Sequence, residues 1–478
     1  MKNHKNMYNT LVLGGGVAGN LLVEKLSLIN SQLNIIGFVD DNNIKAIGTI
    51  QDIPKLIEKH HIQKIVIAIP SERGKLIRKI LLILSEYSEI ELLILPRTTE
   101  IVVGEHVSAE DLRNLELHDL VGEHIDKSLQ KEISSKIQGE NILITGGGGS
   151  IGSELSKQIL LASPKKLIIV DFCEYNLFKL EQSLKRISEL TKNTEIKYVL
   201  GNVNNIPLIE TLLKSNKIHT ICHASAYKHV PLVESNVYEG VLNNAFSTFN
   251  LAMLAKQCDV KNFILISTDK AVRPYNIMGK TKKLAELAVE LVFKNSVNHN
   301  FAIVRFGNVF NSSGSAVELF LSQLNTGNTI TITDPQMTRF FMTIPEAVQL
   351  VLQAGIVASK NSIYMLKMGD PVNIMELAKC IAVLKHNKLS DIKFEITGKR
   401  SGEKIHEELF DNSTETIEES IHPRIFKINH QSHTSPDNIL NELTNLFDNL
   451  DSYEIQNHSS TGQQILINQI DKIISLCH

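Results

Sequence analysis

The chain has 478 residues, of which 43% are hydrophobic and 21% charged. This composition is ordinary for globular α/β proteins, and the length predicts two to three domains. A formal net charge of -3 provides no basic field for nucleic acid, and five scattered cysteines without a CxxC pair predict neither a metal site nor a disulfide framework.

The N-terminal ten residues are polar and contain no signal-peptide core. The apolar runs further along, such as 80–84 and 92–95, are far shorter than the roughly 20 residues of a spanning helix. We therefore expect a cytoplasmic protein with no membrane span.

The first recognisable unit is a strand, a glycine loop and a helix at residues 10–28. Gly14, Gly16 and Gly19, followed by Asp40 after the next strand, formally match a dinucleotide-binding fingerprint. Further strand and helix patterns predict a Rossmann-like domain at residues 1–125. Three interpretations of this domain stay open: an empty structural domain, an assembly surface, and a regulatory site for a nucleotide or a UDP-sugar. The structural and assembly interpretations are slightly favoured.

A polar segment at residues 126–138 predicts a helical linker. Across residues 139–428 strands and helices alternate again, which predicts a parallel, doubly wound sheet with helices on both faces. The fold class is therefore α/β, with two Rossmann-like domains. Residues 429–478 are rich in Asn, Ser and His and predict a tail of amphipathic helices.

A second glycine loop opens this second domain. Gly146 permits a tight turn, Gly149 lets the backbone approach a pyrophosphate, and Gly152 allows close packing of helix and strand. Asp171 follows Gly152 by nineteen residues, where a carboxylate would accept hydrogen bonds from ribose hydroxyls. Because no Arg or Lys follows Asp171 closely, the sequence favours NAD over NADP.

Polar residues also follow the strand at 263–266. Thr268, Asp269 and Lys270 stand where strand ends face the ligand crevice of such a sheet. Met278 and Lys282 are four residues apart, on one face of the next helix. Taken singly, a Thr-Asp pair here would more often be a helix cap, Lys270 a solvated side chain and Met278 part of the core. Their joint placement favours a catalytic role.

These motifs resemble extended short-chain dehydrogenases, whose helix carries YxxxK; Met278 replaces that Tyr and cannot carry a proton. Over about residues 10–410 the chain is similar to bacterial polysaccharide-biosynthesis UDP-N-acetylglucosamine 4,6-dehydratases. The resemblance implies a first domain of the CoA-binding type and a smaller substrate-binding portion in the second. It is carried by the segments 226–234, 267–272, 278–282, 305–309 and 339–347.

The resemblance implies a UDP-amino sugar substrate, a tightly bound and recycled NAD, and a homo-oligomer. Thr268 would bind the 4-hydroxyl, Asp269 would protonate the departing 6-hydroxyl, and Lys270 would be the base at C5. Lys282 would hold the nicotinamide ribose. Further cofactor contacts are expected at Ser150, Ile151, Asn202, Val203, Ala224 and Ala226, and substrate contacts at Lys228, His229, Asn308, Arg339, Arg400 and Glu403.

The chain departs from the family pattern at several positions. Lys270 stands in place of a Glu of the related dehydratases, Asn202 in place of an Asp, and Ser401 in place of a Pro. An Arg expected near Ser313 is absent. Two other functions compete with the dehydratase: a UDP-sugar 4-epimerase, which Met278 argues against, and a non-catalytic NAD-binding sensor or scaffold.

Overall fold

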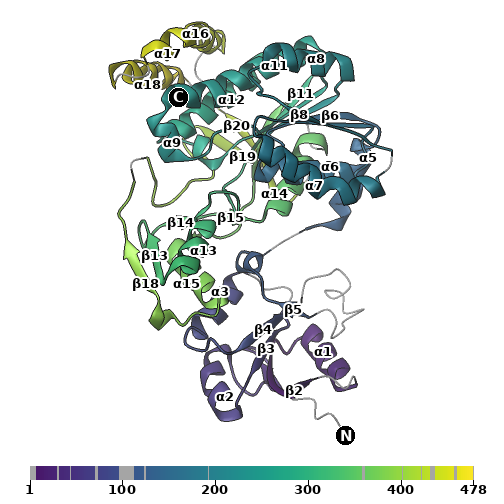
Figure 1. Ribbon diagram of the computed structural model, residues 1–478, viewed down its shortest axis with the longest axis vertical. Helices are drawn as coiled ribbons and strands as arrows, with labels where there is room; N and C mark the ends of the chain where they lie inside the picture. Colours follow the sequence, from purple (N-terminus) through teal and green to yellow (C-terminus); the bar gives the residue numbers. More distant parts are fainter. Residues whose placement is uncertain are drawn as a thin grey trace. The chain divides into compact units, whose positions relative to one another are not determined.

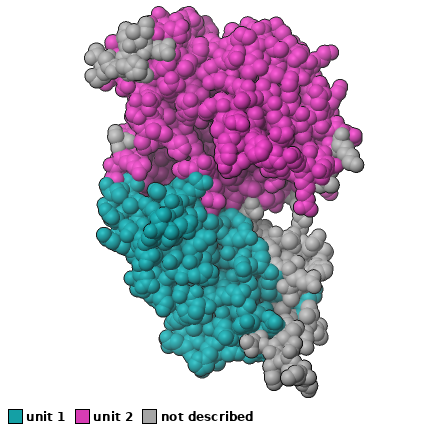
Figure 2. All heavy atoms as spheres, viewed as in Figure 1, with its two compact units in different colours: residues 1–123, 315–336, 372–397 teal, residues 124–314, 337–371, 398–478 magenta. Residues whose placement is uncertain are grey.

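The computed structural model describes residues 7–28, 32–43, 45–69, 74–95, 112–122, 125–191, 193–357, 361–400, 402–420, 422–430, 436–456 and 460–476. The chain forms two compact units (Figure 2). The smaller unit combines residues 1–123 with 315–336 and 372–397, and the larger unit contains 124–314, 337–371 and 398–478. The smaller unit therefore includes two segments from the second half of the chain.

The smaller unit is built on a five-stranded sheet in the order β2-β1-β3-β4-β5. Its first four strands are parallel, and β5 is antiparallel to β4. The strands are β1 (Tyr8–Leu13), β2 (Leu33–Val39), β3 (Lys64–Ile67), β4 (Glu91–Ile94) and β5 (Arg113–Asn114), and the helices between them are α1 (Val17–Leu28), α2 (Ile53–His60) and α3 (Lys75–Ile83).

The later segments of this unit form α13 (Ala316–Thr326), β13 (Thr329–Ile332), α15 (Ile374–Leu384) and β18 (Lys393–Ile396). Helix α15 packs on α3. The buried Arg78 of α3 places Nε 2.8 Å from Glu376 Oε1 and donates from Nη1 to the Leu120 carbonyl. Cys380 Sγ lies 3.6 Å from the Arg78 carbonyl oxygen. The N-terminal sheet thus shares its interior with a helix about 300 residues further along the chain.

The larger unit contains a nine-stranded sheet in the order β19-β20-β16-β11-β10-β9-β6-β7-β8. Figure 1 labels β6, β8 and β11 of this sheet, and also β19 and β20. The seven strands from β16 to β8 are parallel, while β20 and β19 are antiparallel additions. The predicted α/β fold with parallel sheets is confirmed. The strands are β6 (Asn141–Thr145), β7 (Lys166–Asp171), β8 (Glu195–Leu200), β9 (Thr220–His223), β10 (Asn262–Ile266), β11 (Asn300–Arg305), β16 (Ser362–Leu366), β19 (Glu415–Glu419) and β20 (Ile425–His430).

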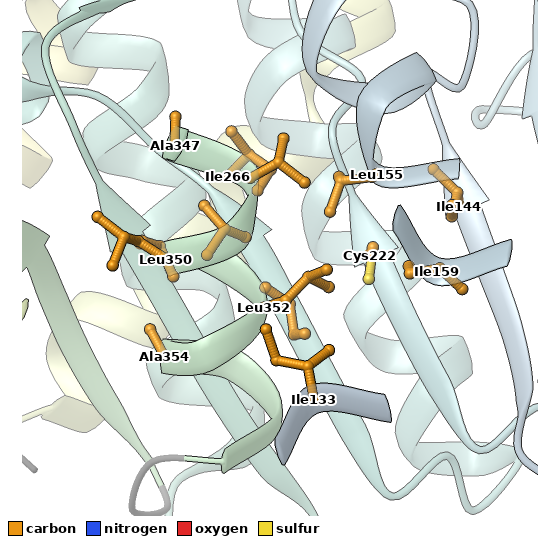
Figure 3. Packing of buried hydrophobic residues seen from close by; sticks show 14 of the residues in the cluster. Ile133, Ile144, Leu155, Ile159, Cys222, Ile266, Ala347, Leu350, Leu352 and Ala354 are labelled. Atoms are coloured by element: carbon orange, nitrogen blue, oxygen red, sulfur yellow. The ribbon is translucent and has the colours of Figure 1, made fainter. Parts of the chain in front are cut away.

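Helices cover both faces of this sheet because alternate residues of each buried strand point to opposite sides. In β6, Ile142 and Ile144 enter one hydrophobic cluster, whereas Leu143 enters the other. Figure 3 shows the first cluster, in which Leu155 and Ile159 of α6 lie near Ile144. The main helices are α5 (Lys127–Ile137), α6 (Ser150–Leu161), α7 (Glu174–Leu190), α8 (Ile206–Asn216), α11 (Ser247–Gln257), α12 (Ile277–Phe293) and α14 (Ile344–Leu352).

The expected helical linker forms α5, and its Leu129, Ile133 and Ile137 are buried in the first of these clusters. The C-terminal segment forms α16 (Pro436–Asp448), α17 (Leu450–Gln456) and α18 (Ser460–Ser475). Helices α16 and α18 pack on α12, and Lys280 pairs with Asp471 at 2.5 Å. Among the described residues, no helix combines the length and the apolar character needed to cross a membrane.

Candidate functional site

The second glycine loop joins β6 to α6, and its conformation requires glycine. Gly146 has φ +68°, and a Cβ there would lie 2.7 Å from the Ser225 nitrogen. A Cβ on Gly152 would lie 2.0 Å from the Gly146 carbonyl oxygen. By contrast, a Cβ on the exposed Gly149 would meet its nearest atom only at 3.4 Å. The loop is therefore tightly packed at its two ends and open in the middle, where a phosphate could approach the backbone.

Asp171 is fixed at the end of β7 beside this loop. Its Oδ2 accepts a hydrogen bond from Gly148 N at 2.8 Å, and its Oδ1 accepts one from Cys173 N at 2.8 Å. The side chain is almost fully buried. The carboxylate is thus held at the position where the ribose of a dinucleotide would lie.

A pocket opens over the loop and the ends of the neighbouring strands. Its lining includes seven of the predicted cofactor residues: Gly146, Gly149, Asp171, Asn202, Val203, Ala224 and Ala226. Ser150, Ile151, Gly152 and Lys282 are not part of that lining. The lining also contains eight residues that the sequence did not predict: Val170, Phe172, Cys173, Asn176, Gly201, Ser225, Tyr227 and Asn243.

This lining fits a dinucleotide, since it combines the fixed carboxylate of Asp171 with the open Gly149, which caps the N-terminus of α6, in one pocket. Several missed residues directly follow predicted ones, so the position after a strand end was an available signal. Asn243 carries no such signal, because it comes from the π-helical turn at Val241–Phe246.

Asn244, next along that turn, ties the pocket wall to α12. Its Oδ1 accepts from Tyr227 N at 2.7 Å, and its Nδ2 donates to the Tyr227 carbonyl and to Thr281 Oγ1. The side chain is fully buried. Asn244 therefore fixes the loop after β9 relative to the helix that carries Lys282.

His223 at the end of β9 is a structural link. Its ring nitrogens lie 2.6 Å from Thr145 Oγ1 and 2.9 Å from Thr248 Oγ1. Burial, together with the positive charge of Lys282, lowers the pKa of His223 to about 3. The imidazole is therefore neutral near pH 7 and holds β6, β9 and α11 together.

Lys282 lies one helical turn inside α12 and is almost fully buried. Its Nζ donates to the Ile266 carbonyl at 2.7 Å, at the end of β10. Burial lowers the pKa of Lys282 to about 8, although nearby Glu286 opposes the shift. The amine is therefore directed toward the strand end that leads into Thr268.

Thr268, Asp269 and Lys270 form one hydrogen-bonded group after β10. Lys270 Nζ lies 2.9 Å from Asp269 Oδ1 and 3.2 Å from Asn308 Oδ1, and Thr268 Oγ1 donates to the same Asp269 oxygen. The predicted substrate residue Asn308 thus joins the predicted catalytic residues. Asp269 is buried, yet its Oδ2 has no hydrogen-bond partner in the described structure. A buried oxygen without a partner is costly, and it is the position where a substrate hydroxyl would bind.

The other predicted residues lie in different surroundings. Met278 is buried in an apolar cluster with residues of the C-terminal helices. Lys228 Nζ donates to the Ser313 carbonyl, and the His229 ring lies close to Gly314. Arg400 is exposed, and its backbone N–H is 3.4 Å from Glu403 Oε2. Ser401 lies outside the described residues.

Arg339 is buried and donates to three backbone carbonyls. Nη1 donates to Thr338 and Ile405, and Nη2 donates to Lys404. This geometry attaches Arg339 to the segment that follows Glu403. Its predicted contact with the nucleotide stays a prediction.

A buried charged cluster lies next to the group formed by Thr268, Asp269 and Lys270. Arg305 at the end of β11 makes a two-point contact with Glu286 of α12, at 2.8 and 2.7 Å, and a third bond to Glu415 of β19 at 2.6 Å. Ser267 donates to Glu286 as well. Burial alone would raise the pKa of Glu286, but Arg305 outweighs it and lowers that pKa to about 2. The cluster links the end of β10 to α12, β11 and β19. Of these, β10, α12 and β11 also lead to or carry the candidate site residues.

The first glycine loop repeats the hydrogen-bond pattern of the second. Asp40 Oδ2 accepts from Gly15 N at 2.7 Å and Oδ1 accepts from Asn42 N at 2.8 Å. A Cβ on Gly19 would lie 1.9 Å from the Gly14 carbonyl oxygen. The Asn43 side chain also donates to the Gly15 carbonyl. The two loops are therefore alike in backbone arrangement.

Comparison with known proteins identifies the relatives of this arrangement. The profile of a family described as polysaccharide biosynthesis protein matches residues 142–430. The capsular polysaccharide biosynthesis protein CapD of Staphylococcus aureus is 37% identical over 456 residues, which are 92% of this chain and 74% of the relative. The UDP-glucose 4-epimerase of Rickettsia rickettsii (strain Sheila Smith) is 34% identical over 274 residues, 56% of this chain and 77% of the relative. The X-ray structure of Pen from Bacillus thuringiensis is 31% identical, with a TM-score of 0.56, over 63% of this chain and 89% of that one.

Proposed function

The chain belongs to the polysaccharide biosynthesis protein family, and from that premise we propose that it is a 4,6-dehydratase of a UDP-N-acetylhexosamine. The product is a UDP-4-keto-6-deoxy-N-acetylhexosamine for surface glycan synthesis. The cofactor is NAD, held in the pocket over the second glycine loop. One observation carries the proposal: Asp269 and Lys270 are hydrogen-bonded to each other, and Asp269 keeps a buried oxygen without a partner.

NAD, which Asp171 and Lys282 would hold, would supply the hydride chemistry at C4 and C6 of the sugar. The protein supplies the proton transfers. As hydride leaves C4, Lys270 takes the proton of the 4-hydroxyl and passes it to Asp269, which then protonates the departing 6-hydroxyl. Lys270 also takes the C5 proton, which the 4-keto group makes acidic, and returns a proton to C5 when the hydride reaches C6. Thr268 donates its hydroxyl to the oxygen on C4. An acid and a base held 2.9 Å apart suit an elimination in which both protons move on the same part of the sugar.

Lys282 and the open Gly149 support the choice of cofactor. The buried amine of Lys282 would hold the nicotinamide ribose, and Asp171 would hold the adenosine ribose. No arginine or lysine is found in the pocket lining beside Asp171, which favours NAD over NADP. Lys228, His229, Arg400 and Glu403 are proposed to contact the UDP-sugar from loops of the same unit.

A 4-epimerase is the second candidate, because a relative at 34% identity bears that name. Such a reaction returns the hydride to C4. Both candidate reactions need a base at the 4-hydroxyl, and the epimerases that the chain resembles use the helix tyrosine for it, whereas the proposed dehydratase uses Lys270. Met278 stands at the helix position where the resemblance would place a tyrosine, and it is buried among apolar residues. A thioether cannot transfer a proton, so Met278 favours the dehydratase.

Mass spectrometry of the product separates the candidates. The purified protein would be incubated with UDP-N-acetylglucosamine, without added cofactor. Loss of one water from the nucleotide sugar supports the dehydratase. A product of unchanged mass with altered chromatographic mobility supports the epimerase. Binding of NAD without turnover of any UDP-N-acetylhexosamine would instead support a sensor or scaffold.

A further inference from the structure

Lys270 has a further charged neighbour, Glu407, to which the proposed reaction assigns no role. The Glu407 side chain is 6% exposed, and its Oε1 lies 3.9 Å from Lys270 Nζ. Glu407 comes from the loop between β18 and β19, more than 130 residues after Lys270. Three oxygens from three segments, on Asp269, Asn308 and Glu407, therefore surround one amine.

Arg339 holds Glu407 in place. Its Nη1 and Nη2 donate to the carbonyls of Ile405 at 2.9 Å and Lys404 at 2.8 Å, just before Glu407. Its Nε lies 3.7 Å from Glu407 Oε1. The backbone also contributes, since Thr338 N donates to the Ile405 carbonyl at 3.1 Å. The segment that carries Glu407 is thus held by both residues of β14 (Thr338–Arg339): by the backbone of Thr338 and by the buried guanidinium of Arg339.

We propose that Glu407 is a positioning residue that holds the amine of Lys270 in line with Asp269 for the elimination. The proposal deepens the dehydratase function and rests on it. A lysine side chain has many rotamers and loses conformational entropy when it is fixed, so a reacting lysine needs partners that hold it. Asp269 cannot serve alone, because its negative charge disappears whenever it carries the proton that it delivers. Glu407 is a second acidic partner of the amine, 3.9 Å from Lys270 Nζ, and it takes no part in the proton delivery.

The chain offers a matched control in the neighbouring residue. Glu408 is 44% exposed and pairs with Lys404 at 3.2 Å and Arg273 at 3.6 Å, not with Lys270. Glu407→Gln and Glu408→Gln therefore remove the same charge one residue apart. The first readout does not depend on turnover: the rate of Lys270 acetylation by acetic anhydride, followed by peptide mass spectrometry with the exposed Lys261 as reference. We expect Glu407→Gln to raise this rate relative to Lys261, and Glu408→Gln to leave it unchanged.

The second readout is turnover. We expect Glu407→Gln to lower kcat by about tenfold or more, because small displacements of a reacting group are costly, with KM changed less than about twofold. Glu408→Gln should retain activity. In a Lys270→Gln background, Glu407→Gln should add no further loss, since its effect passes through Lys270.

The two readouts separate the inference from the function on which it rests. An unchanged acetylation rate of Lys270 in Glu407→Gln overturns the role of Glu407, whatever the turnover. If the rate changes but the parent protein removes no water from any UDP-N-acetylhexosamine, the dehydratase proposal fails, and with it the catalytic purpose of the contact. Equal loss of activity in both glutamine variants would also contradict the inference.

Discussion

At the level of single residues, the site contains groups that we propose to transfer protons and, next to them, groups that hold these in place. Asp269 and Lys270 meet at the end of β10, with Thr268 on the same carboxylate oxygen. Behind them, Arg305 and Glu286 are paired and buried, so their charges satisfy each other and hold the strand ends in place. The strand and helix that carry the proposed reacting residues are therefore held together by a buried ion pair whose charges compensate each other.

Replacing Asp269 by Asn should abolish the elimination while NAD stays bound. The amide keeps the size of the side chain but cannot deliver a proton to the 6-hydroxyl. We expect turnover to fall by about 100-fold or more, with the NAD content of the purified protein unchanged. Near-normal turnover in this variant would refute the assigned role of Asp269.

Glu290, further along α12, should make stability depend on pH. Burial raises its pKa to about 7, although Lys283 opposes the shift. Because the pKa is raised, the folded protein favours protonated Glu290. The stability that protonated Glu290 contributes is therefore fully present below the unfolded pKa of 4.5 and is lost as the pH rises through the folded pKa of about 7. Glu290→Gln should therefore stabilise the protein by about 1–2 kcal/mol at pH 8 and by much less at pH 5.

Thermal unfolding of Glu290→Gln at the two pH values measures this difference. Glu189→Gln, on the exposed face of α7, is the control and should show no such dependence. An equal shift in melting temperature at pH 5 and pH 8 would show that the ionisation of Glu290 does not cause the stabilisation.

At the level of helices and strands, the sequence predicted features whose residues are close together in the chain. Gly146, Gly149 and Asp171 could be placed because a strand, a turn and a helix follow one another within 30 residues. The role of Glu407 and the Arg305 cluster could not, since their partners come from segments about 20 to 140 residues apart. The hydrophobic periodicity of a segment does not indicate which distant segment it will contact, so these contacts can be identified only in the folded structure.

The two glycines of the α6 start should respond differently to alanine. A Cβ at Gly149 finds space in the protein but would occupy room needed by the pyrophosphate, so Gly149→Ala should fold normally and bind NAD about tenfold more weakly or worse. A Cβ at Gly152 would collide with the Gly146 carbonyl at 2.0 Å. Gly152→Ala should therefore melt earlier even without NAD.

Calorimetric titration with NAD and thermal unfolding of the apoprotein test this pair. If Gly149→Ala bound NAD like the parent protein, the pocket over this loop would not be the pyrophosphate site.

At the scale of the whole molecule, each unit is completed by distant parts of the chain. In the larger unit, α16 and α18 of the C-terminal segment cover α12, which carries Lys282 and Met278. In the smaller unit, α15 completes the packing of α3. The sequence predicted the sheets but not these contacts, because helix faces of similar apolar character could pack in several ways.

Removing Arg78 should loosen two distant segments of the smaller unit together. Arg78→Ala breaks the pair with Glu376 and uncovers the Leu120 carbonyl, and should cost about 1–3 kcal/mol. Hydrogen exchange followed by mass spectrometry should show faster exchange in both α3 and α15. Faster exchange confined to α3 would contradict the shared interior.

The central claim is that this chain removes water from a UDP-N-acetylhexosamine by an internal redox reaction. Its most direct test is proton NMR of the protein with UDP-N-acetylglucosamine in deuterated water, with no cofactor added. We expect a 4-keto-6-deoxy sugar that carries deuterium at C5, because Lys270 exchanges its proton with the solvent, and at C6 the hydrogen that was originally on C4. Unchanged sugar with NAD present, or a C4 epimer that retains its 6-hydroxyl, would contradict it.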